Sequence, residues 1–334
     1  MKLYWLLFIV FILCSCQDTF LGKDPVSTPK ENFEYLWKTL DERYSFFEYK
    51  HVDWDAVHAK YSKRITNSMD DIRLFNVMFE MLSELRDSHV NLSSPFNVSR
   101  YEKVFTSSPA NYDDKLIKNY LGNDYFITGP FKHQLLNQGK IGYVRYESFE
   151  DNISAGNIDF ITDRFKNTEG IILDVRNNGG GVIANIFSLA SRFADQTRHI
   201  YTSYVKNGPG HEDFKGPDIV TLSPAGNNYT KTVCILTNRN CYSATSFFVL
   251  AMRNFPYVKI VGDTTGGGLG APAGAELPNG WGIRFSCSRT LSPQGDNFED
   301  GIPPDVLVYI TSDDQKKGKD SIIEKAISLI LNGQ

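Results

Sequence analysis

Residues 170–181 decide the fold, and they read GIILDVRNNGGG. The mainly apolar run 171–175 predicts a buried strand, which the following polar residues and glycines end. A helix is expected next, over 183–193. The same order recurs with a strand over 233–236, a polar turn and a helix over 243–253. Apolar strands that alternate with helices predict an α/β protein with a largely parallel sheet covered on both faces.

The rest of the chain divides by composition and periodicity. Apolar residues recur at helical spacing in two stretches, 32–47 and 70–85, and the second leads to the sequence RDSH at residues 86–89. We therefore predict a small helical unit before the α/β core. The predicted segments are a signal sequence (1–16), a polar tether (17–30), the helical unit (31–92), an irregular connector (93–138) and the core (139–334).

The N-terminal segment has the pattern of an export signal. Lys2 is followed by the apolar run 4–13, which is too short to span a bilayer as a mature helix. The sequence LCSC at 13–16 resembles a bacterial lipobox, which implies cleavage after Ser15 and lipid attachment to Cys16. An ordinary signal peptide is the alternative. The lipobox reading predicts a lipid-anchored protein of the bacterial cell envelope, on the periplasmic face or the cell surface.

Composition excludes several classes of function. The chain has 334 residues, 41% hydrophobic residues and a formal net charge of −4, as expected of a folded domain and not of a general nucleic-acid binder. Beyond the signal segment only Cys234, Cys241 and Cys287 remain, and none forms a Cys/His cluster with metal-ligand spacing. We therefore expect neither a metal nor a cofactor.

Two strand-to-helix turns are candidate sites, because ligands of α/β proteins collect at the carboxyl ends of strands. The glycines at 179–181 allow a close backbone approach and can present N–H groups to an anion, although a plain tight turn is an equal alternative. A nucleotide cradle is disfavoured because no GxxxxGK[ST] sequence occurs. Ser243 begins a helix, and either caps it or acts as a nucleophile beside the N–H of Ala244.

Four blocks together resemble peptidase family S41, which includes the C-terminal processing proteases and the tricorn-like proteases. They are residues 170–181, 238–246, 260–268 and the sequence GIPPD at 301–305. The resemblance implies a crotonase/ClpP-like βαβ core and a serine-type peptidase that acts on peptides or unfolded proteins.

The family has two catalytic designs, and the chain fits only one of them. The C-terminal processing branch uses a lysine in the later glycine-rich block, but no lysine lies between Lys259 and Lys316. That branch also carries a PDZ domain, for which the roughly 45 residues before Lys140 are too few. The tricorn-like branch uses a Ser-His element that Ser88 and His89 resemble.

By this resemblance Ser243 is the nucleophile and His89 the general base. Ser88 relays a hydrogen bond from His89 to a carboxylate, for which Glu299 is our choice and Asp296 or Asp300 are alternatives, because Phe298 occupies the expected position.

The same resemblance predicts an oxyanion hole formed by the N–H of Gly180, or of Gly179, and that of Ala244.

The leading hypothesis is a lipid-anchored serine endopeptidase that works through an acyl-enzyme. One alternative is a catalytically weak lipoprotein that binds peptides on the same scaffold, since the carboxylate position departs from the family pattern. The other is an acyl-CoA enzyme, which the likeness to the crotonase-like fold suggests and the export signal disfavours.

Overall fold

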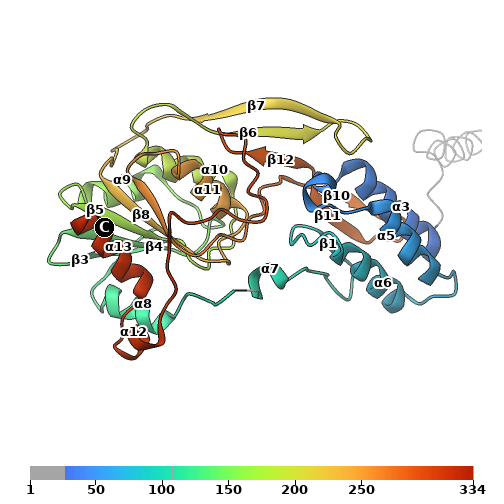
Figure 1. Ribbon diagram of the computed structural model, residues 1–334, viewed down its shortest axis with the longest axis horizontal. Coiled ribbons are helices and arrows are strands. Elements are labelled where there is room, and N and C mark those ends of the chain that lie inside the picture. The colour runs from blue at the N-terminus through green and yellow to red at the C-terminus, as the bar shows by residue number, and fades with distance from the viewer. Residues whose placement is uncertain (1–26, 107, 334) are drawn as a thin grey trace, which may run out of the picture.

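The computed structural model describes residues 27–106 and 108–333, and a seven-stranded mixed sheet lies at its centre (Figure 1). In spatial order the strands are β13 (Val306–Leu307), β9 (Val258–Gly262), β8 (Thr232–Thr237), β5 (Gly170–Asp174), β4 (Ile141–Tyr146), β3 (Phe131–Leu136) and β2 (Phe126–Thr128). The first five are parallel, whereas β3 and β2 add an antiparallel edge. Every residue of β4 and β5 is buried, as expected of strands covered on both faces.

Helices cover both faces of this sheet. One face packs against α9 (Ala155–Arg164), α10 (Ile183–Ala190), which continues into the 3₁₀ turn η2 (Ser191–Phe193), and α11 (Ala244–Met252). The other packs against α8 (Asp114–Leu121) and the C-terminal α13 (Ser321–Asn332). All nine residues of α11 are buried, because its sequence is apolar all round. The predicted α/β class is confirmed.

A second unit precedes the core and lies at the right of Figure 1. Its helical elements are α3 (Pro29–Arg43), α4 (Phe47–Lys50), α5 (Trp54–Tyr61), η1 (Ser62–Arg64) and α6 (Asp71–Ser83). A capping box of Thr28 and Glu31 starts α3, and the Asp70 side chain caps α6. The apolar stripe of α6 therefore begins where the sequence predicts it, and it faces the core of this unit.

The predicted boundaries of this unit are wrong. An antiparallel sheet completes it, in the order β1 (Asn91–Ser93), β11 (Gly282–Ser286) and β10 (Pro272–Glu276), so two of its strands come from the segment assigned to the core. The Trp281 ring packs edge-on against Phe75 of α6, with ring centroids 5.7 Å apart. Local periodicity cannot reveal such a contact, because the two residues lie far apart in the chain.

Two local predictions also need correction. Residues 93–138 are not an irregular connector, because they contain α7 (Lys103–Thr106), α8, β2 and β3. Their polar composition concealed the short apolar stripe of α8 and an edge strand that tertiary pairing stabilises. The helix expected over 32–47 is broken after Arg43, where Tyr44 takes an extended conformation and turns its side chain into the interior.

A third, antiparallel sheet runs along the top of Figure 1, in the order β12 (Ser288–Leu291), β6 (Arg198–Lys206) and β7 (Phe214–Leu222). The short α12 (Ser312–Lys316) precedes α13. Within residues 27–106 and 108–333, no helix combines the length and the apolar character needed to cross a bilayer. The predicted signal sequence and lipidation site, residues 1–16, lie outside the described residues.

Candidate active site

The two candidate turns lie side by side because β5 and β8 are parallel neighbours whose carboxyl ends meet at one edge of the sheet. The buried Asn178 joins them. Its Oδ1 accepts hydrogen bonds from the Gly180 N–H, at 3.0 Å, and from the Thr245 hydroxyl, at 2.7 Å. Its carbonyl oxygen accepts from the Tyr242 N–H at 3.2 Å. The glycine turn is thus fixed against the start of α11.

Ser243 has a strained backbone, and its side chain makes no hydrogen bond within the part of the chain that the structure describes. Its φ of 55° and ψ of −122° lie in a region that non-glycine residues seldom adopt. The Ser243 N–H donates to the Gly267 carbonyl oxygen at 2.9 Å, but the hydroxyl does not cap α11. The helix-cap interpretation of Ser243 is therefore wrong, and the strained turn presents a hydroxyl with no structural task.

Backbone N–H groups suited to an oxyanion lie next to this hydroxyl. A Cβ on Gly180 would lie 2.9 Å from the Ala244 nitrogen and 2.9 Å from the Ser243 Cβ, so only glycine allows this approach. The Gly180 N–H itself is engaged by Asn178. Among the described residues, no protein acceptor takes the N–H of Gly179 or of Ala244. These two are the available donors of the predicted oxyanion hole.

The fold brings His89 next to Tyr242, the residue before Ser243. The imidazole packs against the ring of Tyr242, which directly precedes Ser243, with ring centroids 4.7 Å apart. His89 is 3% exposed, and its Nδ1 is enclosed with no hydrogen-bond partner among residues 27–106 and 108–333. Within the described residues no hydrogen bond joins His89 to Ser243.

The environment of His89 keeps its imidazole neutral. The pKa of His89 is lowered from 6.5 to about 4, mainly by burial. The charge of Asp87 acts in the opposite direction and raises this pKa. Arg284 and Arg100 lower this pKa further. A neutral imidazole is the form that can accept a proton from a serine hydroxyl.

The predicted relay through Ser88 is not formed in this structure. The Ser88 hydroxyl donates to the Tyr101 carbonyl oxygen at 2.6 Å and bonds to no carboxylate. Tyr101 belongs to the segment 93–138 that was expected to be irregular, so its approach to Ser88 could not be anticipated from the sequence.

Of the three candidate acids only Glu299 is buried. Asp296 is exposed and bonds to Ser292, whereas the exposed Asp300 accepts from the Lys50 ammonium at 2.8 Å. Glu299 is 3% exposed, and its Oε2 accepts from the Leu269 N–H at 2.6 Å. Burial, and then the charge of Asp87, raises the pKa of Glu299 well above its usual range.

Three functional candidates escaped the sequence prediction. Asp87 and Lys50 line the same small internal space as Ser88 and Glu299, and Tyr44 donates from its hydroxyl to Asp87. The sequence contained one indication of Asp87, because it stands two residues before the predicted base His89. The sequence contained no indication of Lys50 or Tyr44, because only tertiary packing buries their side chains beside Asp87.

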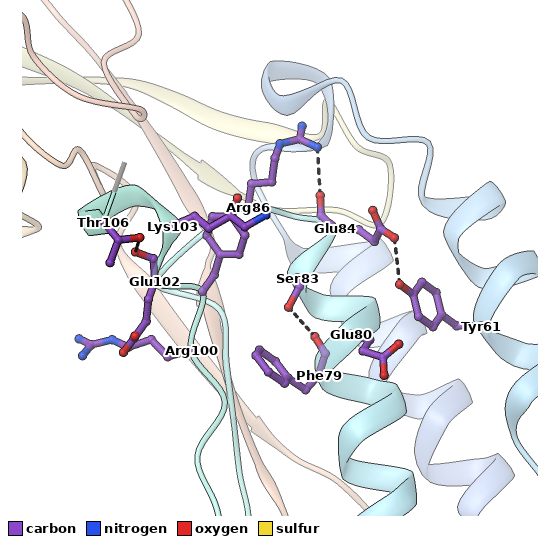
Figure 2. A pocket seen from close by; sticks show the side chains of 11 residues that line it. Tyr61, Phe79, Glu80, Ser83, Glu84, Arg86, Arg100, Glu102, Lys103 and Thr106 are labelled. Carbon is purple, nitrogen blue, oxygen red and sulfur yellow. Dashed lines mark hydrogen bonds between the residues drawn. The ribbon is translucent and has the colours of Figure 1, made fainter. Parts of the chain in front are cut away.

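A larger cavity lies beside this cluster but contains none of the predicted catalytic side chains (Figure 2). It has a volume of about 600 Å³ and lies between α6 and residues 100–106. On its α6 side, Figure 2 shows contacts from the Ser83 hydroxyl to the Phe79 carbonyl oxygen, between Tyr61 and Glu84, and from Arg86 to the Glu84 carbonyl oxygen. The candidate site therefore rests on the turn at Ser243 and not on this cavity.

The low pKa of His89 makes a prediction about stability. Folded His89 stays neutral down to pH of about 4, whereas unfolded His89 binds a proton below 6.5, so acid favours unfolding. As the pH drops from 6.5 to 4, we expect protonation of His89 in the unfolded state to lower the free energy of unfolding by up to about 3 kcal/mol. Urea unfolding at several pH values will show a shallower dependence for His89→Gln. An equal dependence in both proteins would contradict the assignment.

Three comparisons with known proteins identify relatives of this chain. The family model of peptidase family S41 matches residues 140–308, half of the chain, and that of the tricorn protease C1 domain matches residues 25–83. A crystal structure of a "putative peptidase" from Parabacteroides merdae ATCC 43184 is 43% identical, with a TM-score of 0.90 over 92% of this chain and 98% of that one.

Curated relatives match the core. The chloroplastic C-terminal processing peptidase of Tetradesmus obliquus is 27% identical over 50% of this chain and 35% of its own length. The carboxy-terminal processing protease CtpA of Bacillus subtilis (strain 168) is 24% identical over 56% of this chain and 41% of its own length. The chain thus spans about two fifths or less of the curated relatives it matches. With half of its length matched by the family model, and a solved relative 43% identical over 92% of its length, the chain belongs to peptidase family S41.

Proposed function

We propose that this protein is a serine endopeptidase that cuts peptides or unfolded proteins through an acyl-enzyme. The observation that carries the proposal is the turn at Ser243. A strained serine with an unoccupied hydroxyl begins a buried helix, and the free N–H of Ala244 follows it directly. Such a turn presents a nucleophile and an oxyanion donor together.

The reaction follows from these positions. The Ser243 oxygen attacks the peptide carbonyl carbon while its proton passes to His89, and the resulting oxyanion accepts hydrogen bonds from Gly179 and Ala244. His89 then returns the proton to the leaving amine, which leaves an ester on Ser243. Water hydrolyses the ester with His89 again accepting the proton. Because Nδ1 is enclosed, Nε2 is the nitrogen available for these transfers.

A fluorophosphonate probe on the full-length chain tests the proposal. We expect covalent labelling, with the added mass on the peptide that contains Ser243, together with cleavage of an unfolded protein such as reduced casein. The missing hydrogen bond between His89 and Ser243 favours one competing function, a scaffold that binds peptides without cutting them. A folded protein that binds peptide in calorimetry but takes up no probe would establish that alternative and refute the peptidase.

We further propose that the chain is exported and anchored to a bacterial envelope membrane by lipid on Cys16, as the LCSC sequence at 13–16 supports. In a bacterial host fed labelled palmitate, the wild type and Cys14→Ser are expected to incorporate label and sediment with membranes. Cys16→Ser should do neither, since it lacks the thiol that receives the lipid. Label retained by Cys16→Ser would contradict the lipoprotein assignment.

A further inference from the structure

The carboxylate of Asp87 is tied directly to the candidate base. Asp87 is 3% exposed, and its Oδ1 accepts from the backbone N–H of His89 at 2.7 Å. Its Oδ2 accepts from the hydroxyl of Tyr44 at 2.8 Å. Tyr44 is fully buried at the end of α3, so this carboxylate connects the backbone of His89 to the core of the N-terminal unit.

Glu299 has no comparable connection. Its side chain accepts one hydrogen bond, from the Leu269 N–H, and within the described residues none reaches it from His89 or Ser88. Glu299 is held by the turn after β9, whereas Asp87 is held by the segment that carries the histidine. Of these two buried acids, Asp87 is the one that is hydrogen-bonded to His89.

The electrostatics of the cluster separate the two acids further. Two neighbouring buried carboxylates resist being charged together. Burial is the largest cause that raises the pKa of Glu299, and the charge of Asp87 is the next. For His89 the two effects oppose each other, because burial lowers its pKa and the charge of Asp87 raises it. Of the two acids, Asp87 is thus the one whose charge acts on the pKa of His89.

The other charged or titratable groups around Asp87 and His89 come from several separate segments of the chain. The Lys50 side chain is 4% exposed and lines the same small space as Asp87 and Glu299. The remaining groups are Arg86, Arg100 and Arg284, Tyr44 and Tyr242, and Asp300. Two of the arginines, Arg100 and Arg284, oppose protonation of His89, and Asp87 is the carboxylate that favours it.

We infer that Asp87, and not Glu299, is the positioning carboxylate of the His89 base. It fixes the backbone that carries the imidazole, and it supplies the negative charge that stabilises the imidazolium formed when Ser243 attacks. This inference rests on the proposed function of Ser243 and His89, and it departs from the role that the family resemblance gives to Glu299.

The test compares two isosteric variants of the full-length chain, Asp87→Asn and Glu299→Gln. The rate constant of fluorophosphonate labelling, measured from pH 4 to 9, is expected to fall on the order of 10²-fold in Asp87→Asn and by less than about fivefold in Glu299→Gln. Because the lost charge lowers the pKa of His89, Asp87→Asn should also keep a larger share of its plateau rate between pH 4 and 5 than the wild type.

Two further variants exclude a merely structural role. Glu80→Gln changes an exposed acid of α6 that pairs with Arg64, and its labelling should match the wild type. Tyr44→Phe removes one donor to Asp87 and keeps the ring, so we expect an intermediate loss. A larger effect of Glu299→Gln than of Asp87→Asn, or an unshifted pH profile of Asp87→Asn, would overturn the inference.

An NMR titration separates failure of this inference from failure of the proposed function. Labelled histidine gives a His89 signal that is assigned by its absence in His89→Gln. If the wild type takes up no probe, the peptidase proposal fails, and the titration still decides the role of Asp87. A lower His89 midpoint in Asp87→Asn supports the positioning role, and an unchanged midpoint contradicts it.

Discussion

Replacing Ser243 with alanine is expected to abolish fluorophosphonate labelling and peptide hydrolysis, with a loss of at least about 10⁴-fold in rate. The change removes the attacking oxygen and nothing that the fold uses. The Ser243 hydroxyl caps no helix and its backbone N–H, which bonds to Gly267, is retained. Alanine meets the same backbone strain as serine, so the free energy of unfolding should change by no more than about 0.5 kcal/mol.

Ser188→Ala is the matched control for Ser243→Ala. Ser188 also lies on a helix that covers the central sheet, and its hydroxyl donates only to the Ala184 carbonyl oxygen one turn earlier. It should label and cleave as the wild type does. Turnover that survives in a folded Ser243→Ala protein would place the nucleophile elsewhere and refute the proposed function.

His89→Gln is expected to lower the rates of labelling and hydrolysis by about 10³-fold to 10⁴-fold. Glutamine approximates the size of the imidazole but cannot accept the serine proton. The backbone N–H that donates to Asp87 is retained, so the local turn should survive. Added imidazole should restore part of the labelling in His89→Ala, which leaves room for it, and none in Ser243→Ala, because only the first variant retains a nucleophile.

His133→Gln separates the loss of a base from the loss of a buried histidine. His133 is fully buried, bonds to Thr128 and Arg164, and has its pKa lowered to about 4 by burial and by Arg164. It lies on β3, in the antiparallel edge of the sheet. We expect His133→Gln to lose stability and keep its labelling rate. Equal labelling in His89→Gln and the wild type would remove His89 from the mechanism.

Several features follow from the sequence because local rules govern them. The apolar run 171–175 and the glycines after it specify a buried strand and a tight turn, and the structure confirms the α/β class that they predict. The same pattern locates Ser243 at the start of a helix, where the structure finds it. The spacing of apolar residues that marks a strand or a helix, and the backbone conformations open to glycine, depend only on residues close by in the chain.

Other features depend on contacts between distant segments. Two strands from residues 272–286 complete the sheet of the N-terminal unit, and Tyr101 takes the Ser88 hydroxyl that was expected to face a carboxylate. Tertiary packing also joins Asp87 to Tyr44 and buries Lys50 beside them. The sequence by itself thus determined the fold class, the family and the candidate nucleophile and base. Only the tertiary structure decided which charges surround the base, because burial and proximity set a charge's effect and both arise when distant segments pack.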